Sequence, residues 1–338
     1  MEDKIMSTRI LVPLDGSHLA LESLPIALKL TRLWKGQLCL LRVVPPVREN
    51  FLWDWSQVAP IKKKESAEEY LNNIVKDLTE AKENPLAADQ VYPLVIESPS
   101  TGQAIADEAS KQGTDFIIMT THGRSGLSEL VLGSTAHEVI RFTNLPVIFL
   151  RPTLLHPTGQ PDSNIYLKDY KEFSGPVVVA LDGTPEAEIS LAPALDLAEQ
   201  LQLPVQLLRV IPPFVPVDEL ASWYEANIDR GYEYLHEHDF EHIKEEATCY
   251  LEDLATKMDL HKLNGKVALR VGDAVNEIID YANLRKASLV VMATHPHGRL
   301  EQAMLGTVAS QVLTRGNFPV VMVNLAFVKA KAMPVTHH

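Results

Sequence analysis

Short apolar runs alternate with amphipathic segments along the whole chain. The apolar runs are rich in β-branched residues and leucine, as in residues 9–17 (RILVPLDGS) and 40–46 (LLRVVPP). Segments between them, such as residues 18–34 and 104–113, repeat apolar residues at spacings of three and four, which is typical of helices with one buried face. This alternation predicts a parallel sheet that is covered by helices on both faces and joined by right-handed crossovers.

The pattern occurs twice in the chain. Matched segments lie 167 positions apart in the first part of each copy and 173 positions apart later, because the second copy carries six extra residues. The matched pairs are residues 9–17 and 176–184, 40–46 and 207–213, 115–123 and 288–296, and 132–151 and 305–324. Four matches in the same order indicate an internal duplication.

The duplication predicts an α/β fold with two tandem doubly wound domains, each a five-stranded parallel sheet flanked by helices. A chain of 338 residues is long enough for two domains of ordinary size. We place the first domain at residues 1–155 and the second at residues 173–328. Residues 156–172 are expected to be a linker, since their first part is rich in Pro, Gly, Ser and Asn, and residues 329–338 a C-terminal tail.

Composition excludes several classes of partner. The 44 acidic and 31 basic residues give a formal net charge of −13, which opposes binding to the phosphates of nucleic acids. The two cysteines are far apart and form no metal-binding spacing, so a reducing compartment is expected. No apolar run approaches the roughly 20 residues that span a bilayer, and the N-terminal residues do not look like a signal peptide. We therefore expect a cytoplasmic protein that binds neither nucleic acid nor membrane.

Residues suited to a nucleoside follow two strands of the first copy, at the edge where open parallel sheets bind ligands. Asp15 ends the first strand, directly after Pro13 and Leu14, and can accept hydrogen bonds from a ribose or an adenine amino group. Val43 ends the second strand and offers an apolar wall to a base.

A candidate phosphate site follows the fourth strand of the same copy. Gly133, with Ser134 and Thr135, opens the next helix, where backbone N–H groups, the helix dipole and two hydroxyls favour an anion. The other candidate residues are Thr120, His122, Gly123 and Arg124, of which Arg124 is suited to a terminal phosphate. The alternative interpretation is a set of ordinary turn glycines, with Ser134 as a helix N-cap and Arg124 as a solvated side chain.

The arrangement resembles the ATP-binding members of the universal stress protein family, over nearly the whole chain and in both copies. Those members carry a Gly-x2-Gly-x9-Gly-Ser/Thr pattern after a first strand that ends in aspartate. Residues 121–134 (THGRSGLSELVLGS) match this pattern, although Thr120 stands at its first glycine. The resemblance implies an adenine-nucleotide alpha-hydrolase-like fold in which Asp15 and Val43 contact the nucleoside of ATP. It also implies that the glycine loop holds the phosphates together with Mg²⁺.

The last strands of the resembled proteins pair antiparallel across a dimer. Residues 146–151 and 319–324 are the corresponding apolar runs here, and either would be an exposed sheet edge if unpaired. A tandem chain can pair them internally. The resemblance thus implies an intramolecular pseudo-dimer, a homodimer, or both.

The second copy retains only part of the nucleotide pattern. Its first two glycines are replaced by Ala293 and Pro296, and proline removes a backbone N–H from the loop. We therefore expect weaker binding at a second, degenerate nucleotide site. Its candidate residues are Ala180, Leu181, Asp182, Val210, His295, Gly306, Thr307 and Val308.

These features favour a stress-response regulator or sensor that binds ATP and has an unidentified protein partner. No catalytic residue and no metal ligand set is assigned, because His122 lacks an orienting carboxylate nearby and the His238-x-x-Glu241-His242 pattern arises easily in an acidic helix. Two alternatives remain: a weak ATPase or nucleotidyl-transfer enzyme, and a stress protein that binds no nucleotide and acts as a dimerising interaction module.

Overall fold

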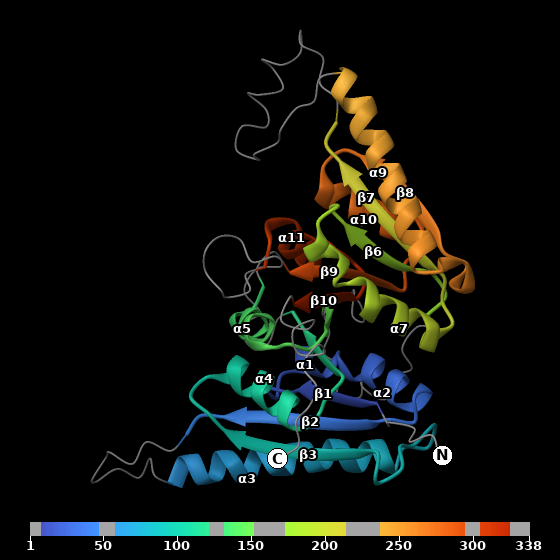
Figure 1. Cartoon of the computed structure of the whole chain (residues 1–338). Helices are drawn as coiled ribbons and strands as arrows, with labels where there is room; N and C mark the ends of the chain where they lie inside the picture. The colour runs from blue at the N-terminus through green and yellow to red at the C-terminus, as the bar shows by residue number, and fades with distance from the viewer. Residues whose placement is uncertain are drawn as a thin grey trace, which may run out of the picture.

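A single ten-stranded sheet runs through both copies in the computed structural model (Figure 1). The structure describes residues 8–46, 58–121, 132–151, 173–213, 237–294 and 305–324, without the side chains of residues 58–63 and 237–239. The predicted linker, residues 156–172, and the predicted tail, residues 329–338, lie outside these ranges. The strand order is β3-β2-β1-β4-β5-β10-β9-β6-β7-β8.

Each copy contributes five strands to this sheet. The strands are β1 (Arg9–Pro13), β2 (Gln37–Val44), β3 (Val91–Glu97), β4 (Phe116–Thr120), β5 (Val147–Leu150), β6 (Val177–Leu181), β7 (Val205–Ile211), β8 (Lys266–Val271), β9 (Leu289–Thr294) and β10 (Val320–Asn324). Within each copy all neighbours pair in parallel. The predicted fold class, two tandem doubly wound domains, is confirmed.

Helices cover both faces of the sheet, and each face has its own hydrophobic core. The helices on one face are α1 (His18–Leu21), α2 (Leu24–Leu33), α3 (Val58–Thr79), α6 (Pro185–Glu188), α7 (Leu191–Leu201) and α9 (Glu237–Lys257). Those on the other are α4 (Thr101–Lys111), α5 (Ser134–Phe142), α10 (Ala274–Leu284) and α11 (Thr307–Arg315). Strand residues alternate between the two cores, with Ile10 and Val12 in one and Leu11 in the other. A short 3-10 helix, Leu260–Leu263, precedes β8.

The helical periodicity of residues 18–34 is confirmed, and the segment forms two helices, α1 and α2. Pro25 lies in the first turn of α2 and has no N–H to donate to the preceding turn, so a helix must restart there. The hydroxyl of Ser23 donates to the carbonyl of Ala20 at 2.6 Å and closes the break. The second copy breaks at the same place, between α6 and α7.

Strands β5 and β10 pair antiparallel and join the two copies. Phe149 faces Val320, Ile148 faces Val321 and Val147 faces Met322. All of these side chains are buried, because helices cover both faces of the sheet here. The internal pairing that a tandem chain allows is therefore present, and it leaves neither β5 nor β10 at a sheet edge.

The residues that end these two strands reach across the junction to the last turn of a helix in the other copy. Asn324, at the end of β10, donates from Nδ2 to the carbonyl oxygens of Ile140 and Thr143 at 2.9 and 3.0 Å, where α5 ends. Arg151, just after β5, donates from Nη1 to the carbonyl of Arg315 at 3.4 Å, where α11 ends. The Asn324 contacts are buried, whereas those of Arg151 are exposed.

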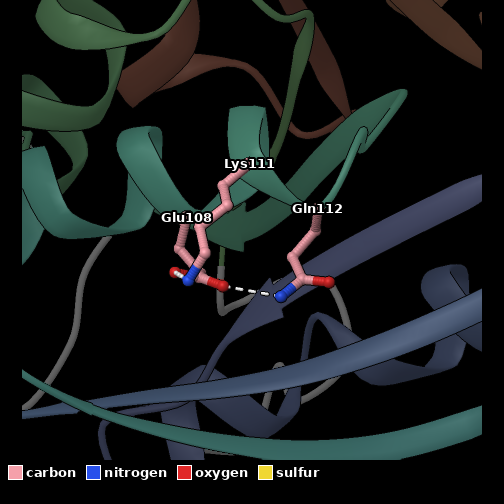
Figure 2. Close-up of polar contacts among 3 residues, drawn as sticks. All are labelled: Glu108, Lys111 and Gln112. Atoms are coloured by element: carbon pink, nitrogen blue, oxygen red, sulfur yellow. Dashed lines mark hydrogen bonds and ion pairs between the residues drawn. The ribbon is translucent and has the colours of Figure 1, made fainter.

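Away from the junction the two copies differ in their buried polar groups. In the first copy Glu108, near the end of α4, accepts a hydrogen bond of 2.6 Å from Gln112 and contacts Lys111 at 3.4 Å (Figure 2). In the second copy the hydroxyl of Tyr281, at the matching position of α10, donates to Gln206 at 2.7 Å. The second copy therefore has a different polar side chain, Tyr281, at the position of Glu108, and this side chain is also hydrogen-bonded.

We expect Asn324→Leu to lower the free energy of unfolding by about 2 kcal/mol, because leucine has a similar shape but leaves two buried carbonyls without their donor. Urea denaturation followed by circular dichroism measures the change. The matched control is Arg151→Leu at the corresponding position, where exposed contacts should contribute only about 0.5 kcal/mol. Equal losses in the two variants would contradict a special role for the buried Asn324 contacts.

Candidate functional site

A cavity of about 260 Å³ lies at the carboxyl ends of β1, β2 and β4 in the first copy. The helices that complete its walls are α1, α4 and α5. Its lining residues are Pro13, Leu14, Asp15, Ala20, Leu41, Val43, Thr101, Ile105, Met119, Thr120, Thr121, Gly133, Ser134, Thr135 and Ala136. We call this cavity the first pocket.

Asp15 is held in position by the turn that follows β1. Its Oδ1 accepts hydrogen bonds from the backbone N–H and the hydroxyl of Ser17, at 2.8 and 2.6 Å. The same Ser17 hydroxyl accepts from the N–H of Ala20 and caps α1. Gly16 lies between them with a φ of 83°, a conformation that glycine adopts at no steric cost. An ionised carboxylate has about four acceptor positions, so Asp15 can also accept from a ligand.

The N-terminus of α5 faces the same cavity. Gly133 is the N-cap residue and, as a glycine, has no side chain to cap the helix, so the interpretation of Ser134 as an ordinary N-cap is wrong. The N–H of Gly133 donates to the carbonyl of Thr121 at 2.9 Å, which ties this end of α5 to the end of β4. The N–H groups of Ser134 and Thr135 have no intrahelical acceptor, because they belong to the first turn. Together with the helix dipole, they favour an anion at this end of the pocket.

The first pocket brings together eight of the eleven residues predicted for it: Pro13, Leu14, Asp15, Val43, Thr120, Gly133, Ser134 and Thr135. The other three, His122, Gly123 and Arg124, lie outside the described residues. Thr120 is the last residue of β4 and is buried, so threonine in place of the family's glycine is compatible with ordinary strand backbone here.

Several lining residues were missed by sequence reasoning. Thr101 and Ile105 come from α4, which packs against α5, and no local pattern relates that helix to the ligand edge. Met119 and Leu41 are core residues of strands whose ends reach the pocket. Ser17, which does not line the pocket but holds Asp15, had a visible signal, because a hydroxyl residue follows Leu-Asp-Gly in both copies.

A second pocket of about 390 Å³ lies at the corresponding place in the second copy. It contains seven of the eight predicted residues, namely Ala180, Leu181, Asp182, Val210, Gly306, Thr307 and Val308, whereas His295 lies outside the described residues. Asp182 is held as Asp15 is, with Oδ1 accepting from the N–H and hydroxyl of Thr184 at 2.9 and 2.6 Å. Gly306 is the N-cap of α11, again without a side-chain cap.

Glu22 is an unexpected buried acid in the first copy, at the C-cap of α1. Its side chain is only 5% exposed, and its Oε2 has no hydrogen-bond partner among the residues that the structure describes. Burial raises the pKa of Glu22 from its ordinary value of 4.5 to about 8. The matching residue of the second copy is Ile189, so the acid is a property of the first copy alone.

Two findings bear on other classes of function. Within the described ranges, no three histidine, cysteine or acidic side chains gather as a metal site, and His242 instead contacts Glu246 at 3.4 Å on an exposed helix face. None of the helices in those ranges is both long and apolar enough to cross a membrane.

Comparison with known proteins gives matches in both copies. The profile of the Universal stress protein family matches residues 6–151 and again residues 174–324. A universal stress protein of Bacillus subtilis is 26% identical over 151 residues, which cover 43% of this chain and 100% of that protein. The crystal structure of a universal stress protein from Archaeoglobus fulgidus superposes with a TM-score of 0.59 at 17% identity and covers 94% of this chain and 99% of that one.

A further similar structure is that of a universal stress protein in complex with cAMP, so a nucleotide is bound by that protein. It is 16% identical, with a TM-score of 0.31, and covers 43% of this chain and 98% of its own.

We expect Glu22 to make folding stability fall as the pH rises from about 4.5 to about 8. In this window the folded chain keeps the carboxyl protonated while the unfolded chain ionises it, so folding requires proton uptake. Glu22→Gln should abolish this contribution. The free energy of unfolding of the variant, relative to that of the wild type, should therefore be higher at pH 8 than at pH 4.5 by on the order of a few kcal/mol.

Urea denaturation of the wild type and of Glu22→Gln across this pH range measures the difference in their free energies of unfolding. The other acids are common to both proteins, so the pH dependence of this difference reports on Glu22. Glu22→Ile, which copies the second domain, is the matched control and should behave like Glu22→Gln. A constant difference between wild type and Glu22→Gln at all pH values would contradict a raised pKa.

Proposed function

Because this chain belongs to the universal stress protein family, which its two domains match in turn, we propose that it binds ATP in the first pocket and acts as an ATP-dependent regulator or sensor of stress. The observation that carries the proposal is the layout of that pocket. One cavity has a fixed carboxylate and apolar walls at one end and, at the other, a helix N-terminus whose N-cap residue is a glycine.

The carboxylate end suits a nucleoside. Asp15 can accept hydrogen bonds from ribose hydroxyls or from an exocyclic amino group, and its turn holds it in place before a ligand arrives. Val43, Leu41 and Ile105 line the cavity with apolar surface against which an adenine ring can pack.

The helix end suits phosphates. The first N–H groups of α5 and the hydroxyls of Thr120, Ser134 and Thr135 line the same cavity, and all of them can donate to phosphate oxygens. In this proposal Mg²⁺ binds with the phosphates, and His122, Gly123 and Arg124 complete the loop around them. The second pocket, with its own Asp182 and Gly306, is the weaker of the two sites for ATP.

A regulatory role is supported by the contacts at the other end of α5. The N-terminus of this helix faces the pocket, and its last carbonyls accept hydrogen bonds from Asn324 of the second copy. A phosphate that moves α5 would therefore act directly on the junction between the copies. We propose that a cytoplasmic protein partner, or a second copy of the chain, senses this change.

We expect the purified protein to release ATP on denaturation and to bind added ATP–Mg²⁺ in calorimetry. Gly133→Val should weaken binding at least tenfold, about 1.4 kcal/mol, because the valine side chain would occupy the phosphate end. Gly133 has a φ of −60°, which valine also adopts, so the backbone tolerates the change.

Gly306→Val is the matched control, since Gly306 has nearly the same conformation, with a φ of −61°. It should leave the tighter ATP site unchanged. Mass spectrometry of the released ligand separates a sensor, which returns intact ATP, from an enzyme, which accumulates ADP. No released nucleotide and no heat with ATP would reject the proposal.

A further inference from the structure

The second pocket differs from the first in one consistent way. Most lining residues are the same at matched positions, including the aspartate, the valine on β2 and β7 and a buried methionine, Met119 in the first pocket and Met292 in the second. At three positions a threonine of the first pocket is replaced by a residue without a hydroxyl. The replacements are Thr101 by Ala274, Thr120 by Ala293 and Thr135 by Val308.

These three replacements are not spread evenly over the pocket. Ala293 is near the end of β9, Ala274 is the first residue of α10 and Val308 lies in the first turn of α11. They therefore gather around the N-termini of the two helices, at the end that corresponds to the proposed phosphate end of the first pocket. The nucleoside end, with Asp182, Val210 and Leu208, is retained.

Hydroxyls are also lost outside the pocket, as where Ala198 stands at the position of the buried Thr31, but the second copy keeps buried polar contacts elsewhere. Where Glu108 and Gln112 form a polar contact in the first copy, Tyr281 and Arg285 form polar contacts with Gln206 in the second. The second pocket is also larger, at about 390 against about 260 Å³.

We propose that the second pocket binds an uncharged nucleoside-type ligand, with a flat ring and hydrogen-bond donors, in preference to a nucleoside triphosphate. This inference rests on the proposed ATP site in the first pocket. Asp182 accepts hydrogen bonds from the donors of the ligand, and Val210, Ile278 and Met292 pack against its ring. Ala274, Ala293 and Val308 provide methyl groups where phosphates would need donors.

The N-terminus of α11 still favours an anion through its dipole, so the balance depends on magnitudes. A helix N-terminus contributes a few-fold in affinity at an exposed site, whereas each hydroxyl hydrogen bond to a charged group contributes roughly tenfold. The loss of three hydroxyls therefore outweighs the dipole. One chain would then carry two pockets that respond to two different ligands.

The two pocket methionines give a separate signal for each site. With ¹³C-methyl-labelled methionine, the NMR signals of Met119 and Met292 are assigned from Met119→Leu and Met292→Leu, and the full chain is titrated with ATP–Mg²⁺ and with adenosine. We expect Met119 to respond to ATP at lower concentration than to adenosine. Met292 should respond to adenosine at a concentration at least tenfold below that required for ATP.

Exchange of the three residues tests the cause. The triple variant Ala274→Thr, Ala293→Thr and Val308→Thr should tighten ATP binding at Met292 at least tenfold and leave adenosine binding within about threefold. The reverse variant, Thr101→Ala, Thr120→Ala and Thr135→Val, is the matched control and should weaken ATP binding at Met119 by a similar factor.

The outcomes separate the two proposals. If Met119 responds to ATP while Met292 responds to ATP at least as well as to adenosine, or to neither, the selectivity of the second pocket is refuted and the first ATP site stands. If Met119 does not respond to ATP but Met292 prefers adenosine, the proposed function fails and the selectivity stands.

Discussion

The antiparallel pairing of β5 with β10 is the contact on which the rest of the molecule depends. Both strands are apolar, and each would be an exposed sheet edge if its domain stood alone. Their pairing buries this edge strand in both copies. It converts two five-stranded sheets into one sheet of ten strands and makes the cores on each face continuous. The pseudo-twofold relation of the two pockets follows from this pairing.

The junction also places a polar connection between the copies where a ligand could act on it. Helix α5 begins at the first pocket and ends at Asn324, so one rigid element joins the proposed phosphate end to the neighbouring domain. The corresponding helix α11 ends at Arg151, but those contacts are exposed and longer. The polar contacts between the copies are thus shorter and more buried at the end of α5 than at the end of α11.

Asymmetry recurs at every level of this duplicated chain. At three pocket positions the first copy has threonine where the second has alanine or valine, and the buried Glu22 of the first copy is matched by Ile189. The buried acid lowers stability increasingly as the pH rises from about 4.5 to about 8, and it has no counterpart in the second copy. Duplication preserved the backbone of the fold, because its strands and turns are set by repeated local patterns, while the side chains around each pocket changed separately.

The sequence by itself determined the duplication, the five strands of each copy and the turn residues at the ligand edge, because these depend on local periodicity and on glycine and aspartate in fixed turns. It also placed Asp15, Val43 and Gly133 at one edge, since parallel strands end together. Only the tertiary structure decided which distant residues meet there. Thr101 and Ile105 enter the pocket because α4 packs against α5, Glu22 is buried because a break between two helices turns it inward, and Asn324 reaches α5 because β10 lies beside β5. Such contacts depend on packing between segments far apart in the chain, which no local pattern encodes.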